Sequence, residues 1–557
     1  MDKSSLKNEK HEEERVEDID VTRSSIQKRS SKDENGSSLD ETVQIDERKL
    51  LWKIDLHIIP WLSLLYLLSF LDRGSIGNAK LYNLERDLGI TDRQYLNGLT
   101  VFFFPYAFIE VSSLGVFPEQ LSTSLLCGSA SQQRFSATFE AICLSLEHDD
   151  HLGSGNGNAF IRLSLRVPKF INIMSLQTCH GVITSYAGLL VVRFLLGITE
   201  GGLYAGVVFY ISSWYKRSEL GVRIAVFFSA ASVAGAFSGL LAAAIANMEG
   251  IGGKAAWQWI FILEGLATIV IAFASFWAIE DFPISARFLS DEERRFVIER
   301  LKNDSKQSAG GENFSMKHIY AAYKDWQTWL CLAIFMGFDG PLYAFALFTP
   351  SVINQLGFHA TEANLLSVPV YVWACLVTCA VGVLADRTRS RGYINIAFFG
   401  IGLAGYIILI ASRSPALSYF GVFLAASAIY PVTANSASWV ACNLEGSYKR
   451  AVALATVIGW GNLNGAVTSN VYRAKDAPWY RLGHGIILGY IAIGFFASII
   501  YHVLLKRENN KRARGERDEV ITGIVNPLAR EVNGVYQSVE EAKQKKGDKW
   551  SGFRYTV

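Results

Sequence analysis

The long middle part of this sequence has few charged residues. The chain has 53 Lys and Arg and 51 Asp and Glu; residues 1–49 hold 24 of these and residues 506–557 hold 20, which leaves 60 for residues 50–505. A soluble domain carries about 25% charged residues, and the middle part carries about half that fraction. The composition therefore argues against a soluble multi-domain enzyme and for a protein with several membrane spans.

Motifs for phosphate, metal and covalent chemistry are also missing. The seven cysteines lack the spacing of a metal site or a disulfide framework. No Lys followed by Ser or Thr comes after the glycine-rich strings 201–206 and 459–465, so we interpret them as helix-packing faces rather than phosphate loops. The net charge of +2 gives no reason to expect nucleic acid as a partner. The sequence therefore predicts no enzyme and no cofactor, and it disfavours an ATP-driven pump.

Apolar segments long enough to cross a bilayer recur along the middle part. The predicted spans are 54–79, 94–113, 186–210, 223–246, 257–279, 327–353, 362–384, 392–411, 416–440, 449–471 and 482–505. The charged stretch 280–325 divides them into two comparable halves, an arrangement that is typical of a transporter built from repeats.

These spans predict an all-α, polytopic membrane protein. Its predicted parts are a disordered cytoplasmic tail (1–49), a helix bundle (50–279), a cytoplasmic central loop (280–325), a second bundle (326–505) and a cytoplasmic C-terminal tail (506–557), which is polar and also expected to stay unstructured. Residues 114–178 show neither a long apolar run nor a helical period, so we interpret them as an irregular insertion. Within and just after it, 170–184 is apolar but short, and predicts a stunted third helix.

Basic clusters predict the orientation of the spans. They lie at Lys216, Arg217 and Arg223, at Arg387, Arg389 and Arg391, at Lys449 and Arg450, and at Lys506, Arg507, Lys511, Arg512 and Arg514. The positive-inside rule places all of them in the cytoplasm, and an even number of predicted spans separates each cluster from the next. The N-terminal tail lies on the same side only if residues 113–186 contain one more crossing.

Ionisable side chains inside spans are costly, so they are candidates for function. The first span ends with Asp72 beside Arg73, and the third contains Arg193 and Glu200. A spacing of seven puts Arg193 and Glu200 on one helix face, about two turns apart. Such a pair can stay together without a ligand and separate when an anion or a proton arrives, which would couple the two. Structural salt bridges between helices are an equal alternative.

Other polar residues interrupt the spans. Glu264 is expected to have a structural partner, and Glu110 to pair or to reach the membrane interface. Asp339 either lines a cavity at a broken helix or caps a helix. Neutral candidates for contact with a substrate are Tyr106, Tyr343, Asn435 and Asn462 with Asn464; interhelical hydrogen bonds are the alternative for each.

Six motifs together resemble the major facilitator superfamily. They are LDRGSIGNAKLYNLERDLGITDRQY at 71–95, RFLLGITEGGLYAGVVFYISSWYKRSELGVRIAVFFSAA at 193–231, WIFILEG at 259–265, EDFPISARFLSDEER at 280–294, GVLADRTRSRG at 382–392 and KDAPWYRLGHG at 475–485. More narrowly, the chain resembles the fungal allantoate, nicotinate and pantothenate permeases of the anion:cation symporter family, over about 50–113 and 178–505.

This resemblance implies the major facilitator fold of two six-helix halves around a central cavity. It also implies proton-coupled uptake of a small organic anion, with the plasma membrane as the expected location and a monomer as the expected state. By similarity, Arg73 would meet the carboxylate of the substrate, and Asp72 and Glu200 would be the protonation sites. Arg193 would hold Glu200 deprotonated until the substrate arrives.

The motif GVLADRTRSRG resembles the second copy of the superfamily's cytoplasmic gate. By similarity, Asp386 would form the latch with the nearby arginines, Arg387 and Arg391.

The chain also departs from the family pattern. Ser75 stands where the permease group has Asn, and residues 114–178 hold nothing similar to the family's loop and third helix. The third helix is therefore predicted to be aberrant or missing. Two alternatives to active transport follow: a nutrient receptor that does not transport, suggested by the long charged tails, or a transporter inactivated or misread over 114–178.

Overall fold

Long α-helices make up most of the structure. The computed structural model describes residues 45–113, 176–216, 219–279, 283, 286–306, 320, 322–444, 447–523 and 526–557. Within these ranges, eight helices are long and apolar enough to cross a membrane: α2 (Glu47–Leu81), α11 (Leu220–Ile245), α12 (Ala256–Ala278), α15 (Trp326–Asn354), α16 (Ala360–Thr388), α17 (Arg391–Ala411), α18 (Pro415–Asn443) and α20 (Arg481–Ala513). The tail predicted at 1–44 and the insertion predicted at 114–175 lie outside the described residues.

The remaining predicted spans also coincide with helices. These are α4 (Asp92–Ser113), α19 (Ser447–Thr468) and the pair α9 (Tyr186–Glu200) and α10 (Leu203–Ser212). The interruption between α9 and α10 lies at Gly201 and Gly202, and Gly202 has a positive φ of 87° that a residue with a Cβ rarely adopts. Of the predicted short third helix, residues 176–180 are helical.

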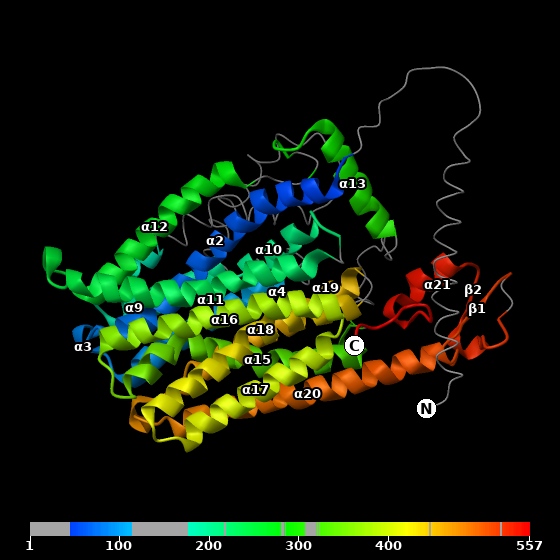
Figure 1. Ribbon diagram of the computed structural model, residues 1–557. Helices are drawn as coiled ribbons and strands as arrows, with labels where there is room; N and C mark the ends of the chain where they lie inside the picture. The colour runs from blue at the N-terminus through cyan, green and yellow to red at the C-terminus, as the bar shows by residue number, and fades with distance from the viewer. Residues whose placement is uncertain are drawn as a thin grey trace, which may run out of the picture. The chain divides into compact units, whose positions relative to one another are not determined.

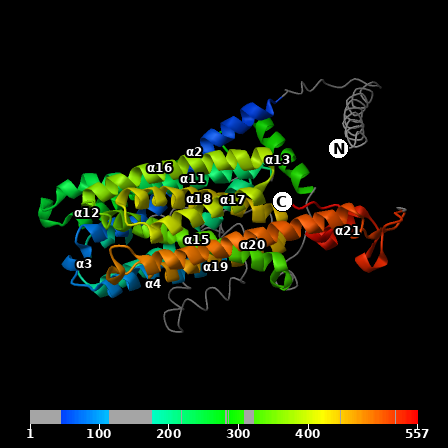
Figure 2. The same ribbon diagram turned by 60° about the horizontal axis from the view of Figure 1, so that its bottom comes forward.

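In chain order the spans form two groups, before and after the central loop, whose helix α13 lies at one end of the bundle (Figure 1). In the second group, α15 packs against α18, α19 and α20, while α17 packs against α18 and α20. Figure 2 shows α17 beside α20 along this bundle. The first group, as far as it is described, consists of α2, α4, α9–α10, α11 and α12. The two groups meet where α11 contacts α16 and where α4 contacts α19.

Glycines allow helices to approach each other at the level of the backbone. A Cβ added to Gly77 of α2 would collide with the carbonyl oxygen of Leu347 on α15. In the second group, a Cβ on Gly405 of α17 would lie 2.9 Å from the Ala425 nitrogen of α18. Small residues at such contacts increase dispersion contacts, which drive helix association where the surroundings are already apolar.

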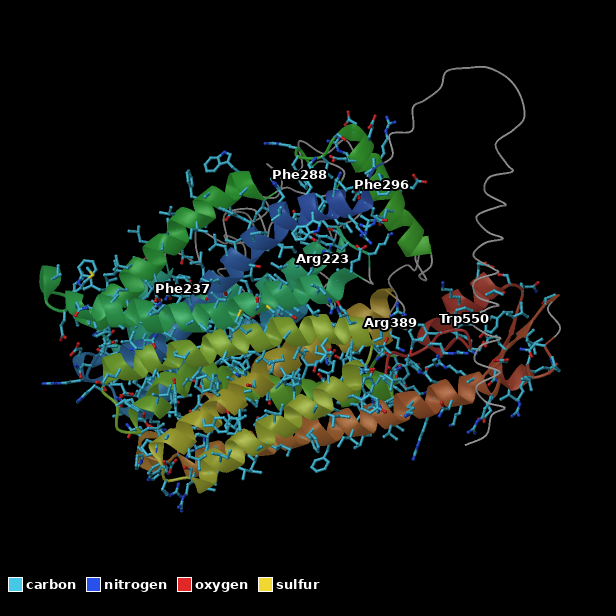
Figure 3. The ribbon with its side chains drawn as sticks, in the orientation of Figure 1. Arg223, Phe237, Phe288, Phe296, Arg389 and Trp550 are labelled. Carbon is cyan, nitrogen blue, oxygen red and sulfur yellow. The ribbon has the colours of Figure 1, made fainter. Side chains whose placement is uncertain are left out.

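Large apolar side chains cover the outer surface of the two groups. Phe237 on α11 is 50% exposed; Figure 3 labels it beside this helix. Val270 and Phe273 on α12 and Phe496 on α20 are also exposed. Large exposed apolar side chains on several spans are expected where the surrounding medium is lipid.

Part of the central loop packs against the first helix group. Helix α13 (Asp291–Lys306) brings Glu293 to within 2.7 Å of the Lys53 ammonium group on α2. Just before α13, the ring of Phe288 stacks on His57 with the centroids 4.2 Å apart. The predicted loop 280–325 therefore contains a helix that is docked through charge and ring contacts.

The C-terminal segment is folded, which differs from the prediction of an unstructured tail. After α20 the described chain forms β1 (Val520–Ile521) and β2 (Val535–Tyr536), which pair in parallel, and α21 (Val539–Lys546). Short 3₁₀ turns accompany them at Glu531–Asn533 and Gly547–Lys549; others lie at Ala246–Met248, Ile251–Gly253 and Ala474–Asp476. The prediction from polar composition was wrong because charged residues of the segment have oppositely charged partners within the fold.

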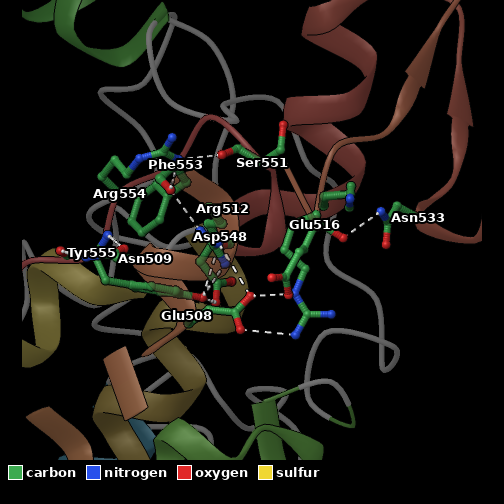
Figure 4. A network of polar contacts seen from close by, with 12 residues as sticks. Glu508, Asn509, Arg512, Glu516, Asn533, Asp548, Ser551, Phe553, Arg554 and Tyr555 are labelled. Atoms are coloured by element: carbon green, nitrogen blue, oxygen red, sulfur yellow. Dashed lines mark hydrogen bonds and ion pairs between the residues drawn. The ribbon is translucent and has the colours of Figure 1, made fainter. Parts of the chain in front are cut away.

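A network of polar contacts docks the C-terminal segment (Figure 4). Arg512 of α20 donates to the Phe553 carbonyl at 2.9 Å and to the Tyr555 hydroxyl at 3.0 Å. Burial raises the pKa of the Tyr555 hydroxyl, so it stays protonated and donates to the Asp548 carboxylate at 3.2 Å. Lys449 of α19 lies between Asp325 and Asp548, at 2.8 Å from the latter. Buried carboxylates therefore tie the end of the chain to α15 and α19.

Replacing Lys449 with Met is expected to release the C-terminal segment. The change leaves two buried carboxylates facing each other, and breaking a buried pair costs about 3–5 kcal/mol. Proteinase K should then cleave residues 514–557 of the purified protein faster. Lys545→Gln is the matched control, because it removes an exposed pair with Glu541 of small energetic value. Equal protection of both variants would contradict the docking role.

Replacing Gly77 with Ala is expected to destabilise the contact between the two groups. The new methyl group meets backbone, which cannot rotate away, and overpacking of this kind costs about 1–3 kcal/mol. The midpoint of thermal unfolding in detergent should fall. Gly489→Ala on α20 serves as the control, because its Cβ would meet no atom within 4 Å; a fall of the same size in both would refute the close-contact explanation.

Candidate functional site

Two neighbouring cavities lie between the helix groups. The first is lined by residues of α2, α4, α9 and α15. The second is lined by residues of α2, α4, α10, α11, α15, α18 and α19. Phe70, Arg73 and Tyr343 line both cavities and therefore form the wall between them.

The guanidinium group of Arg73 lies at this shared wall. Its Nε donates to Oε2 of Glu200 at 2.6 Å, and both side chains are at least nine-tenths buried. The guanidinium carbon lies 5.1, 5.7 and 4.5 Å from the ring centroids of Phe70, Phe102 and Tyr106. Aromatic faces attract a cation, so three rings and one carboxylate fix Arg73 where it faces both cavities.

Glu200 reaches Arg73 because α9 approaches α4 very closely. Glu200 is the last residue of α9, and a Cβ on Gly197, one turn earlier, would collide with the carbonyl of Phe102. The hydroxyl of Ser69 donates to Oε2 of Glu200 at 3.4 Å, while Oε1 has no hydrogen-bond partner in the described part of the chain. Arg73 therefore supplies the main contact of this buried carboxylate.

Asp72, next to Arg73 in sequence, has a different environment. Its side chain is fully buried, and neither carboxylate oxygen has a hydrogen-bond partner among the described residues. Gln177 donates to the backbone carbonyl of Asp72, not to the side chain. An ionised carboxylate without a partner is costly in such a place, so Asp72 stays a candidate for holding a proton.

Arg193 does not pair with Glu200, which differs from the expectation drawn from their spacing. Two turns separate the residues by about 10 Å along the helix axis, whereas Arg73 reaches Glu200 sideways from α2. Arg193 lines the first cavity instead, and its Nε and Nη2 have no hydrogen-bond partner in the described chain. The first cavity therefore has two guanidinium groups in its wall, those of Arg73 and Arg193.

A chain of hydrogen bonds joins the two helix groups beside Arg73. Tyr343 on α15 donates to the side-chain oxygen of Asn462 on α19, whose amide group donates to Glu110 on α4. Tyr106 and Tyr343 both line the second cavity, as the sequence-based assignment to substrate binding requires. Glu110 is fully buried and does not reach the membrane interface.

Asn435, the fourth residue predicted to bind substrate, lies elsewhere. It lines neither cavity, and its amide donates to the Arg391 carbonyl at 2.9 Å and to the Asn395 side chain at 2.7 Å. Helix α18 carries Asn435 toward the start of α17, so its contacts belong to the predicted gate. Pro431 indicated a locally open helix, but it did not indicate the direction in which the Asn435 side chain projects.

The predicted gating residues lie at the junction of α16 and α17. Arg391 Nη2 donates to Asp386 Oδ1 at 2.5 Å, whereas Arg387 is exposed and takes part in no ion pair of the described chain. A Cβ on Gly221, at the start of α11, would lie 2.7 Å from each of these two atoms. The Asp386–Arg391 pair of the second group therefore packs against Gly221 of the first group.

Three further carboxylates inside spans, each already picked out in the sequence, are buried. Glu264 accepts a hydrogen bond from Ser75 and so has the structural partner that was expected. Ser75, the residue that departs from the permease pattern, therefore contacts Glu264. Glu110 and Asp339 line the second cavity. Of the two alternatives for Asp339, the structure shows the position at a cavity; the sequence did not indicate that Glu110 and Asp339 share this cavity with Arg73.

Comparisons with known proteins place the chain in a family. Residues 170–469 match the Major Facilitator Superfamily. The chain is 32% identical to the MFS-type transporter cnsO of Penicillium expansum, with 84% of this chain and 85% of that protein covered. It is 29% identical to the high-affinity nicotinic acid transporter of Saccharomyces cerevisiae, with 84% and 79% covered.

Solved structures agree with this assignment at the level of the fold. The D-xylose–proton symporter has a TM-score of 0.51 at 14% identity, with 81% of this chain and 97% of that chain covered. A bacterial homologue of the human lysosomal transporter Spinster, inward-facing and occupied, has a TM-score of 0.51 at 15% identity, with 80% and 96% covered. The chain therefore belongs to the major facilitator superfamily, and it is a multi-pass membrane transporter rather than an enzyme.

Proposed function

We propose that this transporter carries a small organic anion together with protons. The observation that carries the proposal is the buried ion pair between Glu200 and Arg73, whose side chain lines both cavities. An arginine presents several donors in a plane that matches a carboxylate. A carboxylate in the first cavity would therefore compete with Glu200 for Arg73.

Competition at Arg73 provides the coupling to protons. When the substrate binds the guanidinium group, Glu200 is left as a buried carboxylate without its counter-ion, a state that protonation relieves. When the proton leaves, Glu200 can again bind Arg73 and displace the substrate. Asp72, which has no side-chain partner in the described chain, is the second proton site in this proposal. Arg193 attracts the anion into the first cavity.

The substrate class follows from the arginines and from the relatives. Two guanidinium groups in the first cavity favour a carboxylate, and one similar protein is named as a nicotinic acid transporter. Allantoate, nicotinate and pantothenate are therefore the first compounds to assay. We place the protein as a monomer in the plasma membrane, in line with the permease group that its motifs resemble.

The Asp386–Arg391 pair has the proposed role of a latch at the cytoplasmic gate. It holds the junction of α16 and α17 against Gly221 at the start of α11. Asn435 supports the latch through its bond to the Arg391 carbonyl.

Uptake into proteoliposomes is expected to be faster at about pH 5 than at about pH 7.5, because protonation of Glu200 must accompany substrate binding. Labelled allantoate, nicotinate and pantothenate serve as probes. Arg73→Ala should lower uptake by about tenfold or more. Glu200→Gln should keep binding of the carboxylate but lose the dependence of uptake on pH.

Lys545→Gln, far from the cavities, is the control that keeps wild-type uptake. If wild-type uptake were independent of pH and insensitive to uncouplers, proton coupling would be refuted. Binding of a carboxylate without any accumulation would favour a receptor or an inactive chain.

Replacing Gly221 with Ala is expected to loosen the latch, because its methyl group meets Asp386 and Arg391 at 2.7 Å. A thiol-reactive probe should then label the cysteine of Ala225→Cys faster than in the same variant with Gly221 intact. The control is Gly485→Ala, whose Cβ would have free space. Unchanged labelling in the Gly221 variant would contradict the latch.

A further inference from the structure

The walls of the two cavities carry opposite charges. The first cavity is lined by Arg73 and Arg193 and, among the residues that the structure describes, by no carboxylate. The second is lined by Arg73 and by the carboxylates of Glu110 and Asp339. Because the cavities share the wall at Arg73, a single molecule that extends from one to the other meets positive charge at one end and negative charge at the other.

Asp339 faces the second cavity without a partner. It is 8% exposed, and no hydrogen bond or ion pair of the described chain involves its side chain. The guanidinium group of Arg73 acts on Asp339 electrostatically, but its direct contact is with Glu200. Glu110 adds a second negative charge in the same wall. A carboxylate that is nine-tenths buried and turned to a cavity is a position for a cationic ligand group.

Gly461 fixes where this carboxylate points. A Cβ at Gly461 of α19 would collide with the Asp339 carboxylate, so the side chain lies directly against the backbone of α19. Only glycine permits this contact. The carboxylate is therefore positioned by the meeting of α15 and α19.

Aromatic rings surround the remainder of the second cavity. Its lining includes Tyr66, Phe70, Tyr106, Tyr204, Phe228, Phe335, Phe338 and Tyr343. Neighbouring rings lie close together, with centroids 4.9 Å apart for Tyr66 and Phe70 and 4.7 Å apart for Phe335 and Phe338. A group of rings around a carboxylate is the arrangement that recognises organic ammonium and pyridinium ions through their π faces.

We infer that the substrate is zwitterionic, with a carboxylate and a cationic nitrogen in one molecule. The carboxylate binds Arg73 from the first cavity, and the nitrogen lies among the rings of the second cavity with Asp339 as its counter-ion. This inference rests on the proposed function and adds the second charged group to it. A substrate with a carboxylate alone would leave the buried Asp339 side chain without a counter-ion beside it.

The test measures ligand affinity of the full-length purified protein by thermal stabilisation. The probes are matched pairs that differ in the cationic nitrogen: benzoate against N-methylpyridinium-3-carboxylate, and butyrate against 4-aminobutyrate. In at least one pair the zwitterion should bind about tenfold more tightly, or by about 1.4 kcal/mol, because aromatic faces attract a desolvated cation. Asp339→Asn should abolish this preference while the affinity for the simple carboxylate stays the same.

Controls separate this inference from the proposed function. Asp291→Asn removes an equally charged residue on α13, outside both cavities, and should keep the preference. Gly461→Ala displaces the Asp339 carboxylate without removing its charge and should weaken the preference, which tests the site by a second route. Arg73→Ala should weaken both members of each pair.

Three results would overturn the inference: no zwitterion binds better than its partner, Asp339→Asn leaves the preference unchanged, or the preference follows Asp291. If simple carboxylates still depend on Arg73 in that case, the proposed function holds and only the zwitterionic substrate class is wrong. If no ligand depends on Arg73, the proposed function fails as well.

Discussion

The ion pair between Arg73 and Glu200 is the interaction on which the site depends. Both groups are removed from water, so each requires the other, and three aromatic faces add to the stabilisation of the cation. The pair joins α2 to the last residue of α9, and its Arg73 lies in the wall that the two cavities share. Any ligand that binds Arg73 therefore changes the environment of Glu200 directly, without a long path through the protein.

Close backbone contacts make this geometry possible. Glycines at 197 and 77 let α9 approach α4 and let α2 approach α15, and Gly461 lets Asp339 lie against α19. In an apolar medium helices gain little from burying more apolar surface, so close contact and polar bonds between helices determine how they pack. The same residues that bring the helices together thus determine which charged groups meet in the cavities.

A comparable rule governs the charges outside the spans. The C-terminal segment is rich in charged residues, yet Lys449 with two aspartates, and Arg512 with Tyr555, bind it to the ends of α15, α19 and α20. Each buried charge has an opposite charge or a hydrogen bond at contact distance, which removes the cost of desolvation. Composition alone cannot reveal this, because it counts charges and not their partners.

Sequence alone determined the class of fold, the positions of the spans and the family, because apolar length and local motifs act over a few turns of helix. It also identified the costly residues inside spans, Arg73 and Glu200 among them. Only the tertiary structure decided that Arg73 rather than Arg193 holds Glu200, that Asn435 lies at the gate, and that Asp339 shares a cavity with Arg73. These pairings join residues more than 40 positions apart in the chain. They depend on the distances and angles at which helices pack, which periodicity within one helix does not contain.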